Sequence, residues 1–166
     1  MALLVLSVVG SDRPGLTRAL AAAVLSAGGN WLESHLSQLG GLYVGSVLVE
    51  GDAEALRAAV AAVDAQGLEV RVAPALEGAG PAGETLTFSI VGQDRPGIVR
   101  QVTSVVSDLG ANIETFRTWV TKESHSGAPL FHMAANLRLP QDLAVAKVQA
   151  ALEAISGEIM VDVDVG

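Results

Sequence analysis

The residues best suited to bind a ligand stand in a short motif that the chain contains twice. Asp-Arg-Pro-Gly occupies residues 12–15 and again residues 94–97. If a helix starts at the motif, its first backbone N–H groups are unpaired and can hold a ligand carboxylate, at residues 15–17 or 97–99. The glycine has no side chain, so a ligand can approach the backbone closely. The aspartate can then take an ammonium group.

An asparagine follows each motif at the same spacing, as Asn30 and Asn112. Its amide carries donors and an acceptor, so it can contact either end of a ligand. Open helix N–H groups, aspartate and asparagine together suit a zwitterionic amino acid.

A purely structural explanation competes with ligand binding. Aspartate caps helices, proline starts them, glycine eases a turn, and asparagine often leaves a left-handed turn. Arg13 and Arg95 do not fit this explanation, because no helix cap requires arginine. For them the structural alternative is an ion pair across an interface between domains.

Each motif joins an apolar run typical of a strand to an apolar stripe typical of a helix. Residues 2–10, before the first motif, are almost continuously apolar, which suits a covered strand. A stripe at helical spacing follows the motif: Leu16, Leu20, Val24 and Ala27. Pro14 then fits the first turn of this helix, and Asp12 is a candidate for its N-cap or first turn.

The same reading along the chain gives the order βαββαβ in each half. The predicted strands are residues 2–10, 30–39, 42–49, 68–73, 85–92, 112–120, 130–139 and 159–165. Helices lie between the first and second and between the third and fourth strand of each half. The last helix is predicted to start at residues 140–142 and to end at Gly157. Residues 40–41 form a hairpin turn, and residues 121–127 a longer hairpin loop.

The repeat predicts two domains, residues 1–75 and residues 84–166, joined by a Gly- and Pro-containing linker at residues 76–83. A βαββαβ unit with right-handed crossovers is a ferredoxin-like sandwich. The expected fold class is therefore α+β, with two such sandwiches in tandem. A unit of this size is marginal alone, so we expect each to pack against the other or against a second chain.

Composition excludes several classes of protein. The net charge is −8 and no run of Lys or Arg occurs, so direct nucleic-acid binding is not expected. No apolar stretch is long enough to span a membrane, and no signal peptide is recognised, which favours a cytoplasmic protein. Cysteine is absent. The three histidines have no metal-ligand spacing, and no nucleophile–base pair or cofactor loop is present. We therefore expect no catalytic residues, no metal, no cofactor and no enzyme activity.

The pattern Gly-x-Asp-Arg-Pro-Gly-Leu/Ile, an apolar helix and then Gly-x-Asn resembles the ACT domain, from Gly10 to Asn30 and from Gly92 to Asn112. A chain of this length with two such domains is similar to the glycine cleavage system transcriptional repressor family. The resemblance implies that an amino acid binds between two ACT units. It also implies the contact residues: Asp12, Arg13, Gly15, Leu16 and Asn30, with Asp94, Arg95, Gly97, Ile98 and Asn112.

By this resemblance the chain is a regulatory protein that senses an amino acid, with glycine as one candidate. Its implied protein partner is a DNA-bound transcriptional activator, and a homodimer is a further expectation. Two alternatives stay open. One is an interaction module with empty pockets, whose sheet edges pair with a partner. The other is a regulatory subunit of an enzyme of amino-acid metabolism.

Overall fold

The computed structural model describes residues 1–76, 78, 82–155, 157 and 159–165. The chain divides into two compact units, Met1–Gly78 and Ala79–Gly166. Within the predicted linker, residues 77 and 79–81 lie outside the described residues, so the domain bounds stay a prediction. Each unit is described by itself.

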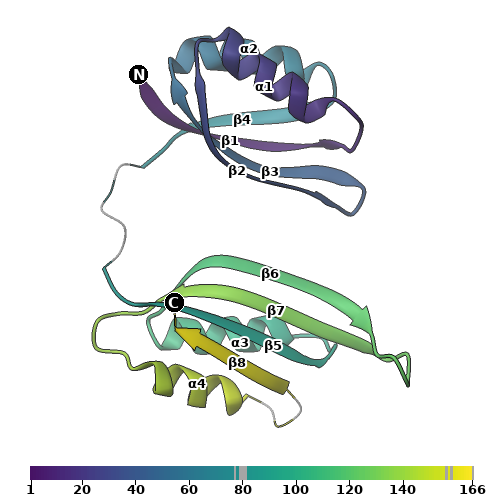
Figure 1. Cartoon of the computed structure of the whole chain (residues 1–166), viewed down its shortest axis with the longest axis vertical. Helices are drawn as coiled ribbons and strands as arrows, with labels where there is room; N and C mark the ends of the chain where they lie inside the picture. Colours follow the sequence, from purple (N-terminus) through teal and green to yellow (C-terminus); the bar gives the residue numbers. More distant parts are fainter. Residues whose placement is uncertain (77, 79–81, 156, 158, 166) are drawn as a thin grey trace. The chain divides into compact units, whose positions relative to one another are not determined.

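The first unit has the predicted order of elements. Its strands and helices are β1 (Ala2–Ser11), α1 (Leu16–Ser26), β2 (Asn30–Leu39), β3 (Leu42–Gly51), α2 (Ala53–Asp64) and β4 (Leu68–Pro74). The strands form one sheet in the order β2-β3-β1-β4, and every paired strand is antiparallel. Both helices cover the same face of this sheet (Figure 1).

The core of the first unit lies between the helices and the sheet. Side chains that alternate along β1, such as Leu4 and Leu6, pack against the apolar stripes of the helices. The predicted stripe residue Leu20 of α1 is fully buried, as is Leu56 of α2. Removing this apolar surface from water stabilises the fold, because each buried leucine contributes about 1.5–3 kcal/mol relative to an exposed one.

The second unit repeats the arrangement. Its elements are β5 (Thr85–Gln93), α3 (Ile98–Asp108), β6 (Asn112–Lys122), β7 (Pro129–Arg138), α4 (Val145–Glu153) and β8 (Ile159–Val165). The sheet order is β6-β7-β5-β8, and α3 and α4 again share one face (Figure 1). The observed folds confirm the predicted class, two ferredoxin-like α+β sandwiches in tandem.

Three local predictions about helix starts are wrong. Helix α1 begins at Leu16 with Gly15 as its N-cap, so Asp12 caps nothing and Pro14 precedes the helix instead of starting it. Helix α4 begins at Val145 with Ala144 as its N-cap. The segment from Pro140 forms a separate turn, in which Leu143 N–H donates to the Pro140 carbonyl. In each case a turn before the helix has the same residue preferences as a cap, so composition does not separate them.

Candidate functional site

The first motif forms the turn between β1 and α1. The N–H of Asp12 donates to the carbonyl of Gly41, which keeps the turn beside the β2–β3 hairpin. Gly15 has φ +92°, a left-handed conformation that glycine adopts without steric cost. The next residue, Leu16, is 4% exposed and anchors the start of the helix in the core.

The glycine of the motif is required by its conformation, and space around it is open. Among the described residues, no atom lies within 4 Å of a Cβ built on Gly15, and the same holds for Gly97. The space beside both glycines is therefore open, whereas ligand binding at these turns stays a prediction.

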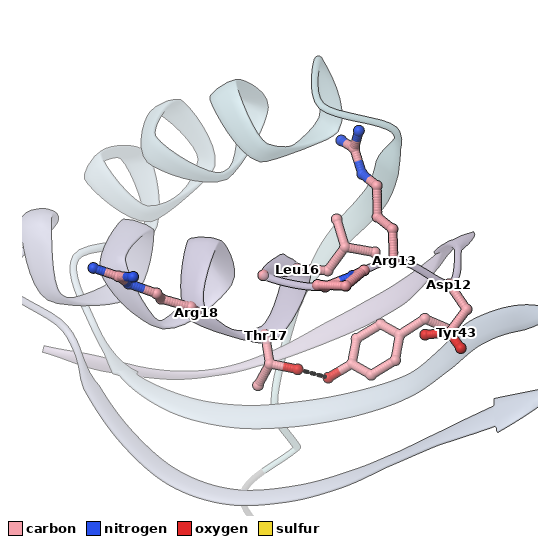
Figure 2. A pocket seen from close by; sticks show the side chains of 8 residues that line it. Asp12, Arg13, Leu16, Thr17, Arg18 and Tyr43 are labelled. Atoms are coloured by element: carbon pink, nitrogen blue, oxygen red, sulfur yellow. Dashed lines mark hydrogen bonds between the residues drawn. The ribbon is translucent and has the colours of Figure 1, made fainter.

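A pocket of about 560 Å³ opens at this turn (Figure 2). Its lining combines charged, hydroxyl and backbone groups: Asp12, Arg13, Pro14, Gly15, Leu16, Thr17, Arg18 and Tyr43. Tyr43 reaches it from β3, where it lies opposite Gly10 of β1. The Tyr43 hydroxyl and the Thr17 Oγ1 are hydrogen-bonded at 2.5 Å.

The charged side chains of this pocket are available for a ligand. Within the described part of the chain, Asp12, Arg13 and Arg18 make no side-chain hydrogen bond or ion pair. All three are exposed. The turn therefore presents a carboxylate, two guanidinium groups and a hydroxyl pair, which are donors and acceptors suited to a small zwitterion. The guanidinium groups of Arg13 and Arg18 point away from the hydroxyl pair, and that of Arg13 lies toward Gly67 (Figure 2).

The predicted asparagine does not join this pocket within one unit. Asn30 pairs with Glu50, which is opposite Leu3 near the start of β1. The motif turn follows the other end of β1, so the two lie roughly 25 Å apart along the sheet, given about 3.3 Å of rise per strand residue. A site that contains both asparagine and turn would need two units, which is the arrangement that the resemblance implies.

The second unit separates its predicted residues in the same way. Asn112 pairs with Arg138, which is opposite Thr85 at the start of β5. The motif turn follows Gln93 at the end of that strand. Asp94 is held there by its N–H, which donates to the Pro129 carbonyl at 3.1 Å.

The second turn has the same backbone and a different neighbourhood. Gly97 is again left-handed, with φ +88°, and Ile98 is 3% exposed. Arg95 donates from Nη2 to the Gln101 Oε1 at 2.5 Å. A pocket of about 490 Å³ reaches this turn from the α3 side, and Gly97 is its one predicted residue; it is lined by Gly97, Arg100, Gln101, Ser104, Val105 and Ile155.

Among the polar side chains of this pocket, those of Thr17, Arg18 and Tyr43 were not predicted from the sequence, although the backbone N–H of Thr17 was. Thr17 and Arg18 belong to the first turn of α1, next to the motif, and their polar side chains were a usable signal. Tyr43 lies far along the chain, and only the pairing of β1 with β3 brings it to the turn.

The described residues contain no group of three or more His, Asp or Glu side chains placed to hold a metal ion. His132 has structural contacts instead. Its ring stacks on Trp119 at 5.2 Å between centroids, and its Nε2 is hydrogen-bonded to Thr121 Oγ1 at 2.7 Å. Separately, none of the described helices is long and apolar enough to cross a membrane.

Comparison with known families identifies the repeated unit. Residues 2–72 match a family model described as an ACT domain, and residues 87–155 match another with the same description. Together these matches cover most of the chain. The chain therefore belongs to the ACT-domain family and carries two ACT domains in tandem, which confirms the predicted resemblance. The presence of two ACT domains supports a ligand-sensing regulatory role for this chain.

Solved structures share the whole two-domain architecture. One, described as an unknown protein from Galdieria sulphuraria, is 27% identical, has a TM-score of 0.87, and is matched over 99% of this chain and 98% of its own. Another, a candidate glycine cleavage system transcriptional repressor, is 17% identical with a TM-score of 0.67 over 99% and 98% of the two chains. At 17% identity the likeness shows the fold alone. A search of curated proteins found no significant match.

Proposed function

We propose that the chain is a non-enzymatic regulatory protein whose ACT domains bind an amino acid, with glycine as the first candidate. The observation that carries the proposal is the pocket of about 560 Å³ at the first motif turn. Ligand pockets of small molecules commonly measure ~300–1,000 Å³ and hold a few placed polar groups. Here those groups are Asp12, Arg13 and the hydroxyls of Thr17 and Tyr43.

The charges of the pocket suit both ends of an amino acid. The Arg13 guanidinium can donate two hydrogen bonds to a carboxylate, and the Asp12 carboxylate can accept from an ammonium group. Neither group has a competing side-chain partner among the described residues. The open space at Gly15 lets the ligand reach the backbone at the start of α1.

Binding would act on a protein partner, for which we propose a DNA-bound transcription activator. The net charge of −8 argues against direct contact with DNA phosphates. The transcriptional role is carried over from the candidate glycine cleavage system repressor, with which the chain shares its fold. A ligand can change such an interaction only through different affinities for two states of the protein.

The proposal is tested by thermal-shift screening of the purified full chain against glycine and the other standard amino acids, with calorimetry on any that bind. A ligand that binds only the folded state raises the melting temperature as its concentration rises. A saturable rise that Arg13→Ala abolishes would support the sensor. If no amino acid shifts the melting temperature, the sensor proposal fails, and a ligand-free interaction module becomes the better explanation.

Affinity capture from cells separates the proposed partner from the alternative one. Recovery of a transcription factor, enhanced or lost on adding the amino acid, supports the regulatory role proposed here. Recovery of a biosynthetic enzyme with the same dependence would show a regulatory subunit of that enzyme instead.

A further inference from the structure

The two motif turns differ in the side chains around them, although their backbones agree. Tyr43 of β3 and Phe131 of β7 occupy equivalent places, each opposite the glycine near the end of the central strand β1 or β5. Thr17 and Val99 are each the second residue of the helix that follows the motif. Both hydroxyl groups of the first unit are therefore replaced by apolar groups in the second.

The hydroxyl pair of the first unit leaves one hydrogen-bond donor for a ligand. Thr17 Oγ1 and the Tyr43 hydroxyl oxygen are 2.5 Å apart, so one proton lies between them. Whichever hydroxyl donates that proton, the other keeps an O–H that is free to donate outward. Phe131, which is 5% exposed, and Val99 offer no donor at the same place.

The two arginines also differ in their availability. Arg95 is half-buried and donates to Gln101, the fourth residue of α3. The fourth residue of α1 is Ala19, which has no polar group. Arg13 is exposed, and within the described residues it has no hydrogen-bond or ion-pair partner. A ligand at the second turn would have to compete with Gln101, whereas a ligand at the first turn would not.

We propose that the first unit's turn is the amino-acid site of the chain and that the second unit's turn binds none. The ligand's carboxylate lies against the Thr17–Tyr43 hydroxyl pair, and its ammonium group lies against Asp12. The exposed Arg13 side chain, whose guanidinium points toward Gly67 in the structure (Figure 2), turns toward the carboxylate when the ligand binds. The second turn keeps the same backbone for a structural reason, to start α3. This inference rests on the proposed function, and it states which of the two repeats senses the ligand.

The test is a titration of the ¹⁵N-labelled full chain with glycine, and then with the other standard amino acids. The amide signals of Gly15 and Thr17 should shift and saturate, while those of Gly97 and Val99 stay in place. Calorimetry should give one bound molecule per chain. Arg13→Ala should weaken binding by about tenfold or more, as expected for a lost hydrogen bond between charged groups.

Three further variants make the comparison specific. The double variant Thr17→Val with Tyr43→Phe gives the first turn the side chains of the second, and should weaken binding by about fivefold or more, since a hydrogen bond to a charged group is lost. Arg95→Ala is the discriminating variant and should change the affinity by less than twofold. Arg57→Ala, which removes an exposed arginine of α2 outside the pocket, controls for the change in net charge.

Three outcomes are separable from the failure of the proposed function. Two bound molecules per chain, or a loss with Arg95→Ala equal to that with Arg13→Ala, would overturn the assignment to one repeat while leaving the sensor intact. Saturable shifts away from the residue 12–18 turn would overturn it as well. The absence of binding by every amino acid would instead remove the sensor and this inference together.

Discussion

Replacing Gly15 by alanine should destabilise the first unit by a predictable amount. Gly15 has φ +92°, where an L-residue pays about 1–2 kcal/mol for the left-handed conformation. An added Cβ meets no described atom within 4 Å, so no steric clash adds to this cost. The free energy of unfolding of the first unit should therefore fall by about 1–2 kcal/mol.

Urea denaturation can measure the stability of each unit separately, because each unit contains one tryptophan whose fluorescence reports its unfolding. Trp31 packs against the core of the first unit, and Trp119 stacks on His132 in the second. With a urea slope of about 1 kcal/mol per molar for a unit of this size, Gly15→Ala should lower the Trp31 midpoint by about 1 M or more. The Trp119 transition, read in a Trp31→Phe background, should not move.

Two control variants make the prediction falsifiable. Gly15→Asn should cost less than Gly15→Ala, because asparagine tolerates left-handed angles better than alanine does. Gly97→Ala should lower the Trp119 midpoint by a similar amount, since Gly97 has φ +88° and equally open space. If Gly15→Ala leaves the Trp31 midpoint unchanged, or if asparagine costs as much as alanine, backbone conformation is not what requires glycine at this turn.

Two further stability predictions use the same assay. Asp52→Ala should lower the free energy of unfolding of the first unit by about 1 kcal/mol, because the Asp52 side chain caps α2 by accepting from the Ala55 N–H at 2.8 Å. The control Asp12→Ala removes no cap and should lower it by less than about 0.5 kcal/mol. Equal losses from the two variants would contradict the observed start of α1 at Leu16. Arg138→Ala should lower the stability of the second unit by about 1–2 kcal/mol, because Arg138 donates to Glu114 at 2.9 and 3.3 Å and to the Gly83 carbonyl at 3.1 Å. The two charged side chains are 29% and 28% exposed, so part of this loss should persist in high salt; a loss that vanishes in high salt would show a simple surface ion pair.

Most secondary structure was readable from local patterns. The strand at residues 30–39 and the strand at residues 159–165 match β2 and β8 residue for residue, and the buried residues Leu16, Leu20 and Val24 of α1 belong to the predicted stripe. These predictions are reliable because apolar residues recur about every second position in a strand that covers a core and every three to four positions in a helix.

The starts of helices were harder to predict, for a physical reason. The segment from residue 140 has the proline and aspartate of a helix start, yet α4 begins at Val145. Likewise Asp12 precedes α1 without capping it. The same residue types favour a turn and an N-cap, so the sequence alone does not show which of the two forms. The packing of the following helix on the sheet decides where that helix begins.

The sequence alone determined that the chain has two βαββαβ repeats, each with an Asp-Arg-Pro-Gly turn between its first strand and first helix, because periodicity and turn chemistry are properties of neighbouring residues. The tertiary structure decided which side chains surround each turn. Antiparallel pairing of β3 with β1 places Tyr43 beside Thr17, and the same pairing in the second unit places Phe131 at that position. It also sets Asn30 at the far end of the sheet from the turn. Such contacts depend on strand register between residues distant in the chain, which no local pattern specifies.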